Sequence, residues 1–205
     1  GYNSGQSVTL TATPDPGFAF VNWTGPADCS DGNVTMNSDI STCTANFVEQ
    51  FTLDVNISPS GGGTVTATGI ACAGDCTEDF NTGTSVVLTP NANAGFIFDS
   101  WTGTGCTTGT VTMTQDRTCT ANFIGQFTLD INLSPSGGGT VTATGINCPG
   151  DCTEDFNTGT SVVLTPSANA GFIFDSWTGT GCTTGTVAMT QDRTCTANFI
   201  GQFTL

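Results

Sequence analysis

Ten cysteines are the residues of this sequence with the most evident chemistry. The chain has no histidine and lacks the paired CxxC spacing of a zinc ribbon, so the cysteines are better suited to disulfides than to metal coordination. A catalytic thiol is not expected, because no histidine is present to activate one. Disulfides form in oxidising compartments, so the cysteine content predicts an extracellular or cell-surface protein.

A cluster of carboxylates beside two closely spaced cysteines is the second candidate. Its members are Asp75, Glu78 and Asp79, which recur as Asp151, Glu154 and Asp155. Carboxylate oxygens bind calcium, although this spacing matches neither the EF-hand loop nor the GGxGxD calcium repeat. A solvated acidic loop is the interpretation that the sequence favours, and no cleft for a glycosidase carboxylate pair is implied.

The three tryptophans each end a Phe-x-Phe-x-x-Trp run, a spacing that could present aromatic rings for sugar stacking. They are Trp23, Trp101 and Trp177. Strand alternation would place Phe96 and Phe98 on one face and Ile97 and Trp101 on the other, unless a bulge intervenes. We expect the tryptophans to pack in the core or between repeats. Carbohydrate binding is the alternative.

The charge of the chain restricts its partners. Arg117 and Arg193 are the only basic residues, against 17 acidic ones, and the net charge is -15. Such a field repels phosphate backbones and anionic lipid headgroups, so nucleic acid is excluded as a partner. No run of 18 apolar residues is present, and no membrane insertion is expected. The glycines at 61–63 lack the lysine and helix start of a phosphate loop, so we expect no cofactor apart from the calcium candidates.

The sequence is a tandem repeat, and the candidate residues recur in its copies. Residues 51–126 and 127–202 are two copies of one unit, residues 1–50 match only its second part, and residues 203–205 begin it again. The two full copies differ at six positions, which are Val55/Ile131, Ile57/Leu133, Ala71/Asn147, Ala73/Pro149, Asn91/Ser167 and Thr112/Ala188. Each of the three copies carries a net charge of -5, and this repulsion favours an extended array at low salt.

Strands are predicted throughout the unit. Apolar residues alternate with polar ones at 51–57, Pro59 and the glycines end that strand, and residues 64–68 are expected to return as its hairpin partner. Residues 85–89 form the next predicted strand, which Pro90 breaks. Further strands are expected at residues 96–101, 110–113 and 118–124. No window has a helical period with caps, so the fold class is all-β with little or no helix.

Only residues 124–126 separate the last strand of one full unit from the first strand of the next. So short a connection restricts the orientation of neighbouring units and predicts a rod rather than flexibly linked domains. The ten cysteines are then divided among three copies. Residues 1–50 hold only Cys29 and Cys43, which favours pairing Cys106 with Cys119, Cys182 with Cys195, Cys72 with Cys76, and Cys148 with Cys152. Bridges between repeats or between chains are the alternative.

The motifs of the unit resemble those of the divergent InlB B-repeat family of bacterial surface proteins. They are, in order, FTLDVNISPSGGGTVTATGIACAGDC, GTSVVLTPNANAGFIFDSWTG, VTM and CTANF. The resemblance implies a small β-domain related to a β-grasp, found in tandem on secreted and surface-anchored proteins, and it implies no catalytic residues. Residues 1–50 depart from the pattern because they lack the first strands and the first cysteine pair.

We therefore predict a tandem array of small disulfide-stapled β-domains, grasp-related or sandwich-like, without enzymatic activity. Its expected role is a rigid stalk, fibre or filament that self-associates on a bacterial surface or in a secreted assembly. An adhesin or carbohydrate-binding module, which would take glycans as partners, is the alternative of a different class.

Overall fold

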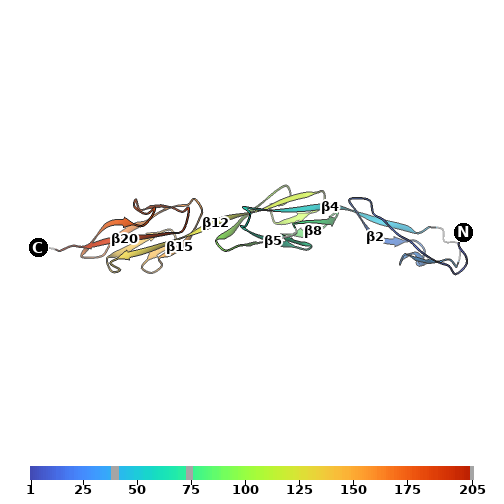
Figure 1. The fold of residues 1–205 in the computed structure, drawn as a ribbon, viewed down its shortest axis with the longest axis horizontal. Coiled ribbons are helices and arrows are strands. Elements are labelled where there is room, and N and C mark those ends of the chain that lie inside the picture. Colours follow the sequence, from blue (N-terminus) through green and yellow to red (C-terminus); the bar gives the residue numbers. More distant parts are fainter. Residues whose placement is uncertain (38–41, 73–75, 204–205) are drawn as a thin grey trace. The chain divides into compact units, whose positions relative to one another are not determined.

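The computed structural model describes residues 1–37, 42–72 and 76–203. In these residues the chain consists of strands and loops, with one short 3-10 helix, η1 (Ala27–Cys29) (Figure 1). None of the helical structure described is long and apolar enough to cross a membrane. Backbone contacts divide the chain into two compact units. The first comprises residues 1–58, 64–91 and 100–122, and the second comprises residues 59–63, 92–99 and 123–205.

The strands recur with the period of the sequence repeat. Residues 1–50 form β1 (Ser7–Thr9), β2 (Phe18–Thr24), β3 (Asn33–Thr35) and the start of β4 (Thr44–Ser58). Residues 51–126 continue β4 and add β5 (Gly63–Ala67), β6 (Ile70–Cys72), β7 (Thr77–Asn81), β8 (Ser85–Val87), β9 (Thr89–Ala92), β10 (Phe96–Thr102), β11 (Thr110–Thr112) and the start of β12 (Arg117–Ser134). Residues 127–202 continue β12 and add β13 (Gly139–Ala143), β14 (Ile146–Cys148), β15 (Thr153–Asn157), β16 (Ser161–Val163), β17 (Thr165–Ala168), β18 (Phe172–Thr178), β19 (Thr186–Ala188) and β20 (Arg193–Gly201).

A sheet in the order β7-β4-β12-β10 forms the main layer of the second repeat, and β15-β12-β20-β18 forms that of the third. Its two central strands are parallel: residues 53–58 of β4 face residues 117–122 of β12, and residues 129–134 face residues 193–198 of β20. The outer strands are antiparallel to their neighbours, as the registers of β7, β15 and β18 show. The first and last strands of a repeat thus lie side by side at the centre, which is the strand arrangement of a β-grasp.

Smaller sheets complete each full repeat, namely β6-β5-β9 with β8-β11, and β14-β13-β17 with β16-β19. The core of the third repeat lies between these sheets and one face of the main sheet. Leu129 and Ile131 point into it, while Asp130 between them and Asn132 after them are exposed, as alternation requires. Val141, Ile146, Leu164, Val187 and Met189 supply its opposite side.

Two details of the predicted strand pairing are wrong. Residues 63–67 (β5) do not return as the hairpin partner of β4, because β7 and the parallel strand β12 occupy both sides of β4, and β5 instead pairs with β6 and β9. Pro90 does not end a strand, since it lies within β9. That strand is at the edge of its sheet, where the missing N–H of proline is tolerated.

The first repeat contains a less complete version of this layout. Its described residues form counterparts of β8, β10, β11 and the closing strand, and none for β5, β6, β7 and β9. Of its described apolar side chains, only those of Cys29 and Val34 are buried. Its core is correspondingly thin.

Candidate functional site

Five disulfides lie within single repeats and give each repeat its covalent constraint. They join Cys29–Cys43, Cys72–Cys76, Cys106–Cys119, Cys148–Cys152 and Cys182–Cys195. The long-range pairs close the loop that precedes the last strand of each repeat, and the short pairs join β6 or β14 to the strand that follows it. Most of these sulfurs lie in the core, since Cys106, Cys119, Cys182 and Cys195 are fully buried.

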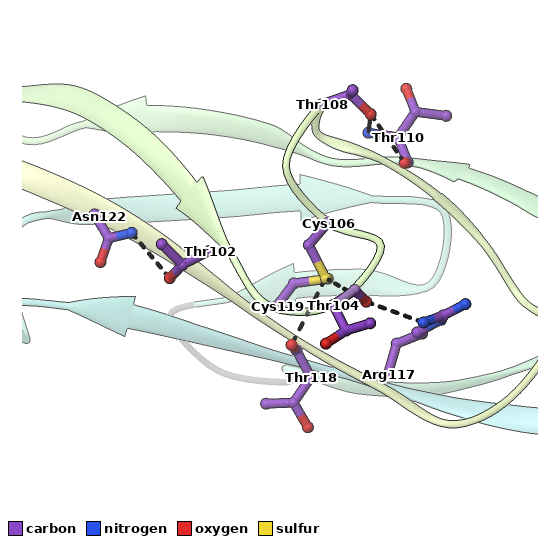
Figure 2. Close-up of a disulfide and its surroundings, with 9 residues drawn as sticks. All are labelled: Thr102, Thr104, Cys106, Thr108, Thr110, Arg117, Thr118, Cys119 and Asn122. Carbon is purple, nitrogen blue, oxygen red and sulfur yellow. Dashed lines mark hydrogen bonds between the residues drawn. A yellow bond between two sulfur atoms is a disulfide. The ribbon is translucent and has the colours of Figure 1, made fainter.

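In each of the two full repeats, an arginine spans the loop that the longer disulfide closes. Arg117 donates from Nη1 to the carbonyl oxygen of Thr104 at 3.1 Å (Figure 2). It also donates from Nη2 to Oγ1 of Thr114 at 3.1 Å. Gly105 makes room for the guanidinium, because a Cβ there would lie 3.1 Å from its Cζ. Arg193 makes the equivalent bonds to Thr180 and Thr190. Both basic residues of the chain therefore have a structural role.

The boundary between the first and second repeats is an uninterrupted strand, since β4 runs from Thr44 to Ser58. Its middle is bonded to both repeats. The amide of Gln50 donates to the carbonyl oxygen of Gly17 at 2.7 Å in the first repeat, and the Gln50 side chain donates to Asn81 Oδ1 at 3.1 Å in the second. The carbonyl oxygen of Glu49 accepts from the amide of Thr82 at 2.8 Å.

The boundary between the second and third repeats has the same bonds. Within β12, the amide of Gln126 donates to Gly95 O at 2.7 Å, and its side chain donates to Asn157 Oδ1 at 3.2 Å. Gly125 O accepts from both the amide and the hydroxyl of Thr158, each at 2.8 Å. Each boundary segment therefore has hydrogen bonds to the repeat before it and to the repeat after it.

A threonine held by two carboxylates follows each boundary. Thr128 donates its amide to Asp192 Oδ1 at 3.0 Å and its hydroxyl to Asp155 Oδ1 at 2.7 Å, and Thr52 makes the same bonds to Asp116 and Asp79. These residues border a groove beside each boundary. The second groove has a volume of about 800 Å³ and is lined also by Phe96, Phe123 and Phe127. Asp116 and Asp192 were not predicted as site residues, because their only signal in the sequence is recurrence at the same position of each full repeat.

The carboxylates considered as calcium candidates do not converge in the part of the chain that the structure describes. Glu78 and Asp79 are consecutive in β7, as Glu154 and Asp155 are in β15, so the members of each pair point to opposite faces of the sheet. Asp79 and Asp155 serve as acceptors for threonine, Asp151 Oδ1 accepts from the amide of Thr153 at 3.4 Å, and Asp75 lies outside the described residues. In the described part of the chain no group of three or more potential ligands is placed to hold a metal ion.

The tryptophans of both full repeats belong to the core. Trp101 and Trp177 are each only 8 % exposed. A β-bulge between Phe174 and Ser176 shifts the register by one residue, so Phe174 and Trp177 share a face and their rings lie 5.3 Å apart. Strand alternation without the bulge would have separated them. Trp23 of the thinner first repeat is half-buried and lies 5.6 Å from the ring of Phe20.

Comparison with known proteins identifies the repeat. The family model described as the divergent InlB B-repeat domain matches residues 1–50, 53–126 and 129–202. The chain belongs to this family. The three B-repeats are therefore tandem copies of a known domain, and in the two full copies the first and last strands are parallel neighbours in one sheet.

The Bacillus anthracis TIE protein matches 90 % of this chain at 9 % sequence identity, with a TM-score of 0.27. The chain spans 41 % of the length of that protein. No curated protein matches the sequence.

Proposed function

We propose that this chain is a structural segment of an extracellular or cell-surface stalk or fibre, in which successive B-repeats are held at a fixed spacing. The observation that carries the proposal is the strand that continues through each repeat boundary, with hydrogen bonds to the repeats on either side. A flexible linker would lack such bonds. The buried disulfides and the family support the location, because disulfides persist in oxidising compartments.

The proposal assigns no chemistry to the repeats. The arginines bind loop carbonyls, the boundary carboxylates bind threonines, and the tryptophans of both full repeats are packed in cores. An adhesin that stacks sugars on Trp101 or Trp177 is disfavoured, because a ring must be exposed to receive a sugar face. A spacer role requires none of these side chains to be available for a ligand.

Spin labels on exposed Thr107 and Thr183, equivalent positions in the second and third repeats, test the spacing role. The labels are carried by non-cysteine residues so that the disulfides stay intact. We expect a narrow distance distribution by double electron–electron resonance, and a broad one after Gly-Ser-Gly-Ser is inserted between Gly125 and Gln126.

Insertion of the same four residues after Gln202 is the matched control, since it leaves the segment between the labels unchanged. It should preserve the narrow distribution. A native distribution as broad as that of the boundary insertion would rule out a fixed spacing between these repeats.

A further inference from the structure

The groove beside the boundary of the second and third B-repeats combines apolar side chains with a pair of carboxylates. Phe96, Ile124 and Phe127 line it and are half-buried, and Asp155 and Asp192 line it and are exposed. All of its lining residues belong to the second compact unit of the chain. They come from the two full repeats, so no missing part of a repeat accounts for the groove.

One threonine holds the two carboxylates close together. Oδ1 of Asp192 accepts from the amide of Thr128 at 3.0 Å, and Oδ1 of Asp155 accepts from its hydroxyl at 2.7 Å. Among the described residues no donor bonds to Oδ2 of either carboxylate. Because an ionised carboxylate has about four lone-pair sites, both groups can accept further hydrogen bonds.

No basic side chain of the described chain neutralises this pair. The sequence contains neither lysine nor histidine, and the guanidinium of Arg193 donates to Thr180 and Thr190. A second copy of the sequence has the same net charge of -15 and would be repelled. Charge complementarity therefore requires a partner of a different, basic composition.

The same combination recurs beside the boundary of the first and second repeats. The groove there has a volume of about 310 Å³ and is lined by the counterparts of Phe96, Phe127, Asp155 and Asp192, which are Phe18, Phe51, Asp79 and Asp116. Glu49 adds a third carboxylate, since it stands where the other groove has Gly125. Aromatic rings beside carboxylates without a counter-ion are thus a repeated property of these boundaries.

We propose that the groove between residues 123–128 and the loops around it binds a lysine or arginine side chain of a partner protein. The aliphatic stem of this side chain packs against Phe96 and Phe127, and its cationic head donates to Asp155 and Asp192. Long basic side chains carry an apolar stem and a charged head, which is the combination that this lining complements. Aromatic rings also attract a cation placed over their faces.

The size of the groove favours a peptide segment over a small amine. Its volume of about 800 Å³ is in the range of sites that enclose a ligand much larger than one side chain, so residues on either side of the basic one also fit. The site does not depend on the spacing role proposed above, because binding requires the groove and not a fixed distance between repeats.

The test titrates the 205-residue chain with the capped peptide Gly-Ala-Lys-Ala-Gly and follows the amide signals of Gly125, Thr128 and Thr158 by NMR. We expect saturable shifts at these residues. A peptide with Nε-acetyl-lysine should cause none, because it lacks the charge. A peptide with 2,3-diaminopropionic acid keeps the charge on a shorter stem, and its Kd should be higher by about tenfold.

Two double variants of the third repeat remove the same number of charges. Asp155→Asn with Asp192→Asn keeps the acceptors of Thr128 and should raise the Kd by about tenfold or more. Asp151→Asn with Asp175→Asn alters exposed carboxylates outside the groove and should change the Kd by less than about threefold.

Four results would overturn the proposal. The first is the absence of shifts at millimolar concentrations of the lysine peptide. The second is equal binding of the short-stem peptide, since the apolar lining then plays no part. The third is an equal rise in Kd for both double variants, which would indicate diffuse attraction to an acidic surface. The fourth is binding of 1,5-diaminopentane as tight as that of the peptide, since the occupant is then a small amine.

Discussion

At the scale of single residues, several glycines are set by what packs against them. Gly185 has a φ of +72° and lies under the Trp177 indole, where a Cβ would be 2.9 Å from Nε1. Gly109 and Gly32 have the same relation to Trp101 and Trp23. In each repeat the glycine allows both a left-handed turn and close packing of the tryptophan edge.

The substitution Gly185→Ala tests this packing. It imposes the backbone cost of a left-handed alanine, about 1–2 kcal/mol, and also a clash with Trp177. We expect faster amide hydrogen exchange in β18 and β19 and a lower urea midpoint for the third repeat.

Gly159→Ala provides the control, because Gly159 has a φ of +85° and a Cβ there would have no neighbour within 4 Å. This variant should lower the free energy of unfolding only by the cost of the left-handed backbone. If both variants lower the free energy of unfolding equally, then close packing against Trp177 is not what requires glycine at position 185.

At the scale of elements, the two kinds of disulfide close loops of different length. Cys182–Cys195 spans 13 residues and Cys148–Cys152 spans 4. In the chain-entropy model the longer loop contributes about 3 kcal/mol to the free energy of unfolding and the shorter one about 2 kcal/mol.

Two double variants of the third repeat compare these loops. Cys182→Ser with Cys195→Ser should lower the free energy of unfolding more than Cys148→Ser with Cys152→Ser, as measured by urea unfolding followed through hydrogen exchange in β20. The reverse order would mean that local packing around the sulfurs outweighs the entropy of loop closure.

The β-bulge and the parallel central strands determine which segments of a full repeat lie together. The bulge places Trp177 beside Phe174 in the core, and the parallel pair brings the two ends of each full repeat together. A parallel pair requires a crossover connection, and β13 to β19 form that connection in the third repeat. The crossover explains why residues 51–57 and 64–68, which were predicted to pair as a hairpin, lie in different sheets.

At the scale of the whole molecule, the disulfides limit how far the chain can be extended by force. The two bridges of a full B-repeat remove 13 and 4 residues from the extensible contour. At about 3.5 Å per residue, less the 5.6 Å and 4.5 Å between the Cα atoms of the bridged cysteines, they withhold about 50 Å per full repeat.

Atomic force spectroscopy of the chain under oxidising and reducing conditions measures this difference. Reduction should lengthen the contour released by each full repeat by about 50 Å, and that of the first repeat by about 40 Å, because the first repeat has only the longer bridge. Identical contour lengths under both conditions would show that the disulfides do not limit the extension of the chain under force.

The sequence by itself determined the all-β class, the three copies and the grouping of the cysteines. Alternation at residues 51–57 specifies a strand with one buried face, and near-identity of two copies specifies that their structures match. The cysteine pairs are local in sequence, and the first repeat holds only one pair. These are local properties, which periodicity and spacing record directly.

Only the tertiary structure decided which strands are neighbours. The parallel contact between residues 53–58 and 117–122, the bulge beside Trp177 and the hydrogen bonds of Gln126 all join segments distant in sequence. It also placed Glu154 and Asp155 on opposite faces of β15. Period-two alternation states which face of a strand is buried, but it carries no information on which strand lies beside it.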